Sequence, residues 1–320
     1  MEEIRWGILG CGNVTEVKSG PAFQKVPFSS VVAVMRRAAA KAADYAERRG
    51  VGRWYDSADA LINDPEVNAV YIATPPGSHC ALALKVAAAG KPCYVEKPMA
   101  RNAGECHRMV DAFARAGLPL FVAYYRRGLD HFTEVKSMID SGRFGSLISL
   151  RYQFSSGHQM CGIPEGWRYH PDVSGGGLFW DLGSHALDLF DWWLGPLRSV
   201  HGHALKRSEA SPVEEVVAMT AITENRVSLA GEWSFISRHA KDRFELEFER
   251  GRVTGSVFGA PELRIEEEGG EPQILNYPQP ENIQFNLISN IVESLRTGAP
   301  ALSTGVSAAR TSAVIDQVAG

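Results

Sequence analysis

The sequence of 320 residues has little cysteine, no block of one charge and no long apolar run. Its five cysteines form no Cys-x-x-Cys pair, and no cysteine–histidine spacing matches a zinc site. We therefore expect buried thiols in a reducing compartment and no metal. No apolar stretch approaches the roughly 18 residues of a membrane span, and the chain starts almost directly with a predicted strand, so neither a membrane association nor a signal peptide is expected. These absences predict a cytoplasmic protein.

The charge composition of the sequence argues against nucleic-acid binding. The net charge is -4, and the 33 basic and 37 acidic residues form no basic patch and no acidic tail. This balance does not favour a nucleic-acid partner. It leaves a small anionic ligand open, because local fields matter more than the total charge.

Residues 1–123 alternate short apolar runs with helical stretches, and the length of the chain suggests two domains. The predicted strands are Ile4–Leu9, Ser30–Met35, Ala69–Thr74, Pro92–Val95 and Pro119–Ala123. Strands that are apolar on both faces and separated by helices are typical of a doubly wound parallel sheet. We predict an α/β Rossmann domain over residues 1–123.

Residues 124–320 follow a different pattern. After a predicted helix at Asp130–Ser141, apolar and polar residues alternate in several segments, most strictly at 243–249. Period-two alternation indicates antiparallel strands with one covered face. We expect an α+β domain over residues 124–320 with an antiparallel sheet, one face of which is covered by a helix near Gly183–Leu194.

A glycine turn follows the first strand. Gly10 allows a tight turn, and Gly12 lets the backbone approach a pyrophosphate at a helix N-terminus. Gly10, Gly12, Asn13 and Val14 are therefore predicted to bind a dinucleotide. The third position of the pattern is Thr15 instead of a small residue, which puts helix–strand packing in question.

No acidic residue follows the second predicted strand, where a carboxylate would bind the ribose of NAD. Arg36 and Arg37 occupy that place, and guanidinium groups match a phosphate bidentately. We predict a preference for NADP(H), with NAD(H) possible and with either arginine able to bind the 2′-phosphate. The alternative is that both arginines face water.

Two further strand ends are predicted to lie at the same edge. Glu96-Lys97-Pro98 ends the strand at 92–95, where a lysine can reach a nicotinamide and a substrate oxygen. Glu96 and Lys97 are therefore predicted at the cofactor. Thr74 and Pro75 begin a rigid loop that is expected to line the cofactor channel. His79 is expected either to contact the cofactor or only to begin a helix.

Asp181 and His185 stand four residues apart in a predicted helix, after three successive glycines at 175–177. A carboxylate beside an imidazole suits proton transfer near neutral pH. Asp188, three residues beyond His185, is a supporting candidate. A metal pair is an alternative at this spacing, but no third ligand is evident.

These motifs together resemble the Gfo/Idh/MocA oxidoreductases over essentially the whole chain. The resemblance implies that Lys97 contacts the nicotinamide region and that Asp181 and His185 act at the reacting carbon. Tyr124-Tyr125-Arg126-Arg127 stands where the family often has Asn-Arg-Arg, so Tyr125 departs from the pattern. Tyr125, Arg126, Trp167 and Arg168 are the predicted substrate contacts, together with Asp181 and His185.

The predicted function is hydride transfer between NADP(H) and a secondary alcohol or carbonyl of a sugar, polyol or diol, with Lys97, Asp181 and His185 as catalytic residues. The alternatives are a cofactor-binding regulator or sensor without turnover, and reduction of a conjugated bond, which would not need the Asp/His pair. The resemblance also implies that the second domain has a large, open, mostly antiparallel sheet and that the chain forms a homodimer or homotetramer through it, since the exposed face would otherwise leave an apolar patch.

Overall fold

The computed structural model describes residues 1–156, 166–207, 209 and 211–320. It divides into two compact units. The first unit consists of Met1–Gly128 and Pro280–Ala309, and the second of Leu129–Gln279 and Arg310–Gly320.

A six-stranded parallel sheet forms the centre of the first unit, in the order β3-β2-β1-β4-β5-β6. Its strands are β1 Ile4–Leu9, β2 Ser29–Met35, β3 Arg53–Tyr55, β4 Ala69–Ile72, β5 Cys93–Val95 and β6 Leu120–Val122. The helical segments are α1 Asn13–Val17, α2 Gly20–Lys25, α3 Ala39–Arg49, α4 Ala58–Ile62, η1 Pro76–Ser78, α5 His79–Ala88, α6 Ala103–Ala116, η2 Tyr125–Gly128 and α10 Phe285–Thr297.

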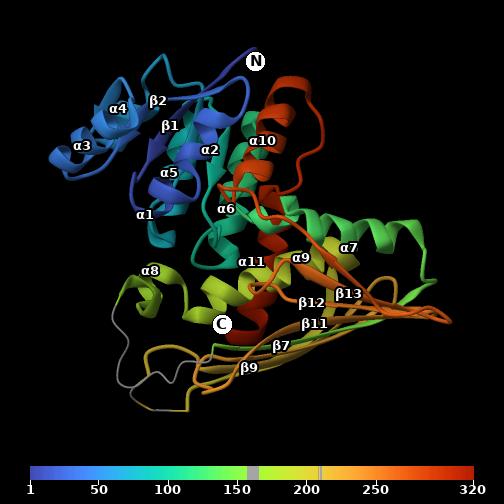
Figure 1. Ribbon diagram of the computed structural model, residues 1–320. Coiled ribbons are helices and arrows are strands. Elements are labelled where there is room, and N and C mark those ends of the chain that lie inside the picture. The colour runs from blue at the N-terminus through green and yellow to red at the C-terminus, as the bar shows by residue number, and fades with distance from the viewer. Residues whose placement is uncertain (157–165, 208, 210) are drawn as a thin grey trace. The chain divides into compact units, whose positions relative to one another are not determined.

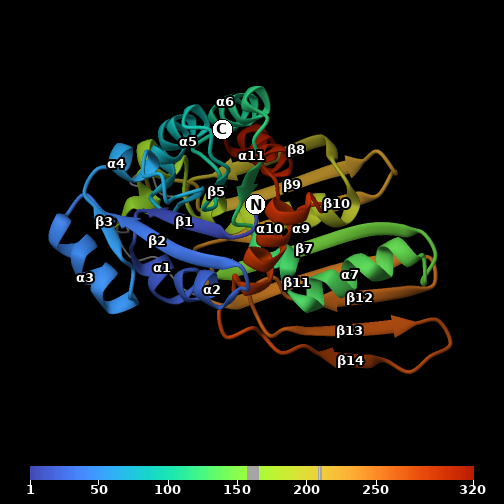
Figure 2. The ribbon, with the colours of Figure 1, turned by 90° about the horizontal axis from the view of Figure 1, so that it is seen from above.

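Helices cover both faces of this sheet, with α1 and α2 on one side and α4, α5 and α6 on the other (Figure 2). The apolar strands are buried accordingly, since every residue of β4, β5 and β6 is buried. An aromatic cluster packs beneath α2, where Tyr71 and Tyr94 stack with ring centroids 4.9 Å apart. The predicted doubly wound parallel sheet is confirmed. The short edge strand β3 was not predicted.

The second unit is built on an eight-stranded sheet (Figure 1), in which the strands follow the order β14-β13-β12-β11-β7-β10-β9-β8 (Figure 2). Its strands are β7 Leu147–Ser156, β8 Leu197–Leu205, β9 Val216–Thr223, β10 Ser228–Ser234, β11 Ala240–Phe248, β12 Gly251–Gly255, β13 Glu262–Glu267 and β14 Gln273–Asn276. The other segments are α7 Asp130–Ser141, η3 Trp167–Tyr169, α8 Pro171–Ser174, the π-helical turn η4 Phe179–Gly183, α9 Ser184–Leu194 and, from Arg310 onward, α11 Gly305–Ala319.

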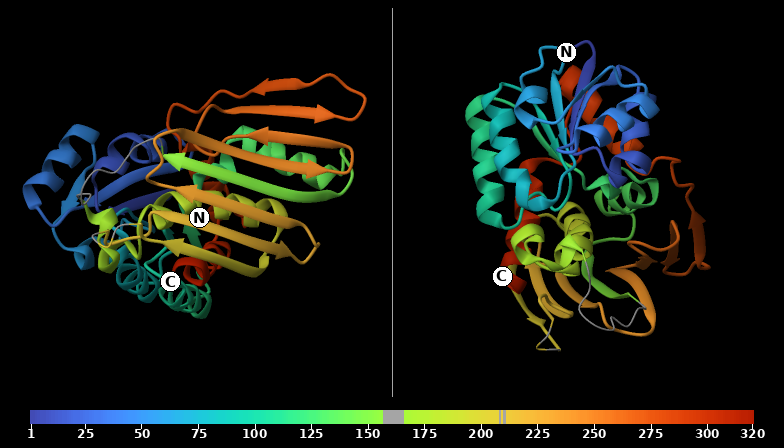
Figure 3. Two further views of the ribbon diagram at one scale, coloured as in Figure 1. Left: turned by 90° about the horizontal axis from the view of Figure 1, so that it is seen from below. Right: turned by 90° about the vertical axis from the view of Figure 1, so that its left-hand side faces the viewer.

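All neighbouring strands in this sheet are antiparallel except β7 and β10, which are parallel. Burial alternates along β9, where Val217, Met219 and Ala221 point inward. The inner face packs against α9, as the 5.3 Å contact between the rings of Tyr152 and Phe190 shows. The opposite face carries neither α7 nor α9 (Figure 3, left). The expected open, mostly antiparallel sheet is confirmed.

Residues 280–309 differ from the expected division at 123/124, because they belong to the first unit. Gln284 is fully buried there and hydrogen-bonds to Tyr94 and Glu96. The Nδ2 of Asn286, on α10, donates to the carbonyl of Gly128 at 2.7 Å. These long-range polar contacts join residues 280–309 to the first unit, and no local sequence pattern predicts them.

Candidate active site

The glycine turn joins β1 to α1 and lies against the end of β4. Gly10 has φ +91°, and a Cβ there would stand 2.6 Å from the Thr74 side chain, so only glycine fits. Around Gly12, in contrast, an added Cβ would meet only the Gly10 carbonyl at 3.9 Å. The turn is closed on the strand side and open beside Gly12, as an approaching pyrophosphate requires.

Thr15 stands where the glycine pattern has a small residue, and the structure shows how the helix packs closely in spite of it. It is fully buried, and its hydroxyl bonds to both the amide and the carbonyl of Gly12. The Tyr45 hydroxyl donates to the Thr15 carbonyl at 3.0 Å. Close packing is provided instead by Gly20 of α2, where a Cβ would lie 2.1 Å from that same carbonyl oxygen.

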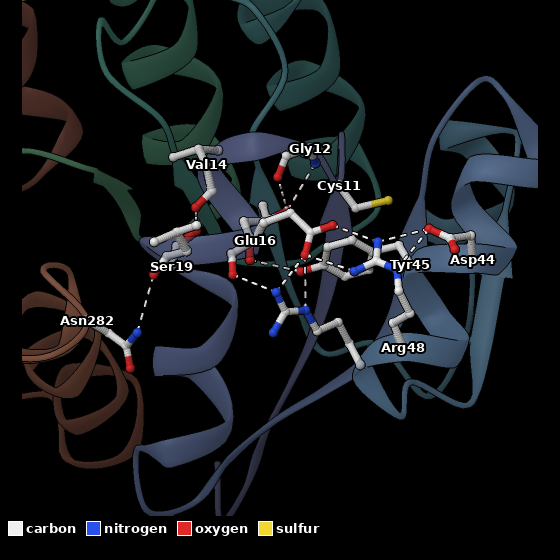
Figure 4. A network of polar contacts seen from close by, with 12 residues as sticks. Cys11, Gly12, Val14, Glu16, Ser19, Asp44, Tyr45, Arg48 and Asn282 are labelled. Atoms are coloured by element: carbon white, nitrogen blue, oxygen red, sulfur yellow. Dashed lines mark hydrogen bonds and ion pairs between the residues drawn. The ribbon is translucent and has the colours of Figure 1, made fainter.

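A charged network ties α1 to α3 beside the turn (Figure 4). The Glu16 carboxylate pairs with Arg48 at 2.7 Å and with Arg49 at 2.6 Å. Hydrogen bonds from Arg48 and Arg49 lower the pKa of Glu16 to about 2. Two guanidinium groups therefore fix the helix that follows the glycine turn.

Arg36 and Arg37 occupy different environments at the end of β2. Arg36 is half-buried, and its Nη1 donates to the Cys11 carbonyl of the glycine turn at 3.4 Å, whereas Arg37 is exposed. Burial raises the pKa of the Cys11 thiol to about 11, although the Arg36 charge opposes this. Arg36 thus lies against the predicted cofactor turn.

The carboxylate of Glu96, at the end of β5, is almost fully buried among internal partners. It accepts hydrogen bonds from the Tyr71 hydroxyl at 2.6 Å, from Gln284 Nε2 at 2.7 Å and from the Lys97 amide at 3.2 Å. Burial and the Glu96 charge raise the pKa of Tyr71 well above its usual value. Glu96 therefore fixes the backbone that presents Lys97, and its contact with the cofactor stays a prediction.

His79 links two loops at this edge of the sheet. Its side chain is fully buried, with Nε2 2.6 Å from the Thr74 carbonyl and Nδ1 3.1 Å from that of Pro98. Burial lowers the pKa of the imidazole. The ring therefore bonds within the protein instead of facing a cofactor. His79 begins α5, as the second of its two predicted roles has it, and its ring also fastens the Thr74-Pro75 loop to the segment after Lys97.

Tyr125 and Arg126, predicted as substrate contacts, lie in η2 of the first unit. Both are buried, and Arg126 Nη1 donates to the Tyr125 hydroxyl at 3.0 Å. The guanidinium carbon also lies 5.0 Å from the centre of the Tyr125 ring. Tyr125, which replaces the asparagine common in the family, thus interacts directly with the neighbouring arginine.

Asp181 lies in the π-helical turn η4 of the second unit, so its spacing to His185 is not that of a regular α-helix. π-helical turns occur frequently at functional sites. Arg168 Nε donates to Asp181 Oδ2 at 2.8 Å, and the Arg168 guanidinium also covers the Trp167 ring at 4.4 Å. The structure thus joins three predicted site residues, with Arg168 holding the Asp181 carboxylate.

Glu214, which the sequence analysis missed, holds the glycine-rich segment that leads into η4. Its nearly buried carboxylate accepts the Gly177 amide at 3.0 Å and the Phe179 amide at 3.1 Å. Burial raises the pKa of Glu214, although these amide hydrogen bonds oppose the shift. No local signal marks this residue, because 37 positions separate it from Gly177.

His185 lies on α9 and is 4% exposed. The Phe258 ring meets it edge-on, with ring centroids 6.0 Å apart and planes at 79°. Farther along α9, Asp188 and Asp191 are buried, and Arg310 pairs bidentately with Asp191. The hydrogen bond with Asp191, and to a smaller extent the negative charge of Asp188, raise the pKa of the Arg310 guanidinium. Phe258 and Arg310 are thus further residues of this region that the sequence did not indicate.

The described residues contain no group of three or more histidine, cysteine, aspartate or glutamate side chains able to hold a metal ion. Among the same residues, no helix is both long and apolar enough to cross a membrane. Four of the five cysteines are described, and all four are buried thiols. Cys161 lies outside the described residues.

The chain belongs to the Gfo/Idh/MocA oxidoreductase family. Residues 4–124 match the family's NAD-binding Rossmann fold, and residues 132–254 match its C-terminal domain. The expected family resemblance is confirmed, and the chain is an oxidoreductase of an NAD-binding family.

Individual relatives agree with this assignment. The chain is 38% identical over 292 residues to Oxidoreductase P35 of Formosa agariphila, covering 90% of each protein. It is 31% identical to inositol 2-dehydrogenase 2 of Saccharopolyspora erythraea over 70% of this chain and 58% of that enzyme. The fold is similar to that of aldose-aldose oxidoreductase from Caulobacter crescentus complexed with glycerol, with a TM-score of 0.87, 23% identity and coverage of 98% and 96%.

Proposed function

We propose that the protein transfers hydride between NADP(H) and a secondary alcohol or carbonyl group of a sugar, polyol or related small molecule. The observation that carries the proposal is the Asp181 carboxylate, fixed by Arg168 on the helical segment that continues to His185. In a chain of a dehydrogenase family, this pair supplies a proton acceptor and a group to orient it. The relatives named for inositol and aldose substrates support the substrate class.

In the proposed reaction, a bound nicotinamide supplies or accepts the hydride. His185 takes the hydroxyl proton during oxidation and returns it during reduction. The Lys97 ammonium stabilises the charge that develops on the substrate oxygen, and Asp181 orients the imidazole. Glu96, through the Lys97 amide, holds the backbone of the lysine in place.

The cofactor preference rests on Arg36 and Arg37. No carboxylate stands at the end of β2 to bind a ribose 2′-hydroxyl, and Arg36 lies beside the glycine turn. A guanidinium there favours a 2′-phosphate. Thr74 and Pro75, next to Gly10, are the proposed walls of the cofactor channel.

Tyr125, Arg126, Trp167 and Arg168 remain the proposed substrate residues. Trp167 is half-buried beneath the Arg168 guanidinium. Its ring can pack on a sugar ring, while Arg168 aligns Asp181.

We also propose a homodimer or homotetramer through the open face of the eight-stranded sheet. A shallow depression of about 620 Å³ on this sheet is lined by residues such as Arg151, His201 and Glu232. Ile148 and Ile222 are about half exposed, at 51% and 48%. Sedimentation of the wild type and of Ile222→Arg tests the proposal, because a charge there should shift the equilibrium toward the monomer. A monomeric wild type at micromolar concentration would contradict it.

The decisive experiment for the activity follows NADPH consumption and NADP⁺ reduction with sugars, keto-sugars, inositols, dicarbonyls and dihydrodiols. Turnover with at least one alcohol–carbonyl pair is expected. Tight NADPH binding without turnover of any substrate would favour the regulator alternative. NADH consumption faster than NADPH consumption would contradict the cofactor preference alone.

A further inference from the structure

The loop between β12 and β13 carries Phe258, whose ring stands beside the proposed proton acceptor. Phe258 is half-buried, and its ring meets His185 edge-on at 6.0 Å. On its other side it packs against Phe154 at 5.3 Å, and Phe154 in turn contacts Phe235 at 5.9 Å. The ring is thus supported by apolar neighbours on the sheet while part of its surface stays accessible.

The backbone of this loop is fixed by one carboxylate. Asp242 of β11 accepts the amide of Val257 at 3.1 Å on Oδ1, and the amides of Phe258 at 2.6 Å and Gly259 at 3.0 Å on Oδ2. The Tyr152 hydroxyl donates to Oδ1 at 2.9 Å. Four donors fill the acceptor capacity of a carboxylate, and three of them are consecutive backbone amides of the loop, so this one side chain fixes the loop backbone.

A loop held in this way resembles the supported loops that present ligand-binding side chains on rigid scaffolds. Since Asp242 bonds to consecutive amides, it determines where the Phe258 ring stands relative to the imidazole.

We propose that Phe258 is a wall of the substrate site, selecting ring-shaped substrates that place a C–H face against it, and that Asp242 is the positioning residue for this ring. This inference rests on the proposed function, because it takes His185 to be at the reacting carbon. The negative face of an aromatic ring attracts weakly positive C–H groups, and cyclic sugars and inositols present several of these on one side. Open-chain polyols present no fixed face and gain less.

The test compares wild type, Phe258→Leu and Phe258→Tyr on a cyclic and an open-chain polyol. Phe258→Leu should raise the KM of the cyclic substrate about 10-fold, since small changes in an apolar pocket typically alter discrimination by 10–200-fold. The kcat should change less, and the dissociation constant of NADPH should stay unchanged. Phe258→Tyr keeps the ring and should restore the wild-type KM.

Asp242→Asn tests the positioning role, with Glu249→Gln as its matched control. Glu249 follows the same strand and accepts the backbone amide of Ser146 at 2.9 Å, but it lies at the opposite end of β11. Asp242→Asn should raise the KM of the cyclic substrate, whereas Glu249→Gln should leave it unchanged. Equal effects of the two variants would show a general loss of sheet stability and overturn the positioning role.

Calorimetric titration of the NADPH complex with the same polyols separates this inference from the proposed activity. If polyols bind but do not turn over, the proposed activity fails, and the affinity of Phe258→Leu decides the role of Phe258. An unchanged KM and affinity in Phe258→Leu would overturn the inference while leaving the activity intact. Binding of no polyol by the wild type would overturn both.

Discussion

The two units hold their candidate functional residues by different means. In the first unit, Gly10, Thr74 and Lys97 follow the ends of neighbouring parallel strands, so the order of the sheet alone brings them to one edge. In the second unit, the carboxylates of Glu214 and Asp242 lie far along the chain from the segments that they fix, namely the glycine-rich segment that leads to Asp181 and the loop that carries Phe258 beside His185. The first arrangement depends on topology, and the second depends on individual hydrogen bonds.

This contrast has a practical consequence. A parallel sheet tolerates many substitutions while its strand ends keep their places. A segment fixed by one carboxylate loses its position when that carboxylate is neutralised. We therefore expect variants of the second-unit carboxylates Glu214 and Asp242 to affect catalysis or substrate binding, and variants of Arg36 and Glu16 in the first unit to affect cofactor choice or stability.

The largest effect is expected at His185. His185→Ala removes the proposed acid–base group and should lower kcat by about 10²–10⁴-fold. NADPH affinity should be unchanged, because His185 is not among the residues proposed to bind the cofactor. Steady-state kinetics and a fluorescence titration measure both quantities. Near-normal turnover would remove His185 from this role.

Glu214→Gln should have the next largest effect. The neutral amide cannot accept the Gly177 and Phe179 amides as strongly, so kcat should fall by about 10-fold. The matched control is Glu215→Gln. Glu215 is equally buried and accepts the Arg207 amide at 2.6 Å. If both variants lower the melting temperature similarly and only Glu214→Gln loses kcat, the carboxylate acts on the site. Equal kinetic losses would contradict this.

A smaller effect, on the preference for NADPH over NADH, is expected for variants of Arg36 and Arg37 in the first unit. Arg36→Ala should lower the NADPH/NADH ratio of kcat/KM by about 10-fold, because a charged hydrogen bond to phosphate contributes about 1.5–3 kcal/mol. Arg37→Ala should have a smaller effect, since Arg37 is exposed and Arg36 lies against the turn. If neither ratio changes, the arginines do not bind the 2′-phosphate.

The smallest effect is expected at Glu16. Its folded-state pKa of about 2 lies below the ordinary 4.5, so its ionised form stabilises the fold above pH 4.5. This contribution is lost as the pH falls from 4.5 toward 2. Glu16→Gln should therefore lower the free energy of unfolding by about 1 kcal/mol at pH 7 and by less at pH 3.

The control for this prediction is Glu281→Gln, which breaks the exposed pair with Lys25. The free energy of unfolding of this variant should stay near the wild-type value at both pH values. A pH-independent difference between Glu16→Gln and wild type would contradict the role of ionisation.

Much of the fold was predictable from the sequence. Strong apolar runs predicted the positions of β1, β2, β4, β5 and β6, and the helix predicted at Asp130–Ser141 is confirmed as α7. The strand β3 was missed because its three residues at the sheet edge are largely exposed and show no apolar run. The turn η4 was missed because a π-helical turn has no period of its own in the apolar pattern.

The candidate site was predictable only as a set of residues. Patterns indicated Asp181 and His185, but the partners Glu214, Asp242 and Phe258 lie too far along the chain for a local pattern to connect them. His79 shows the same difficulty, since the carbonyls that it contacts belong to two separate loops. Spacing along the chain specifies residue types, and only tertiary contacts specify what each side chain bonds to.

The return of residues 280–309 to the first unit means that the chain passes between the units three times, after Gly128, Gln279 and Ala309. A fragment ending near residue 124 would therefore lack Gln284, leaving the buried hydroxyl of Tyr94 and the Glu96 carboxylate short of a partner. An excised nucleotide-binding module would need residues 1–128 joined by an artificial linker to 280–309. Gene fusions and truncations that treat the chain as two consecutive pieces would cut through the core of the first unit.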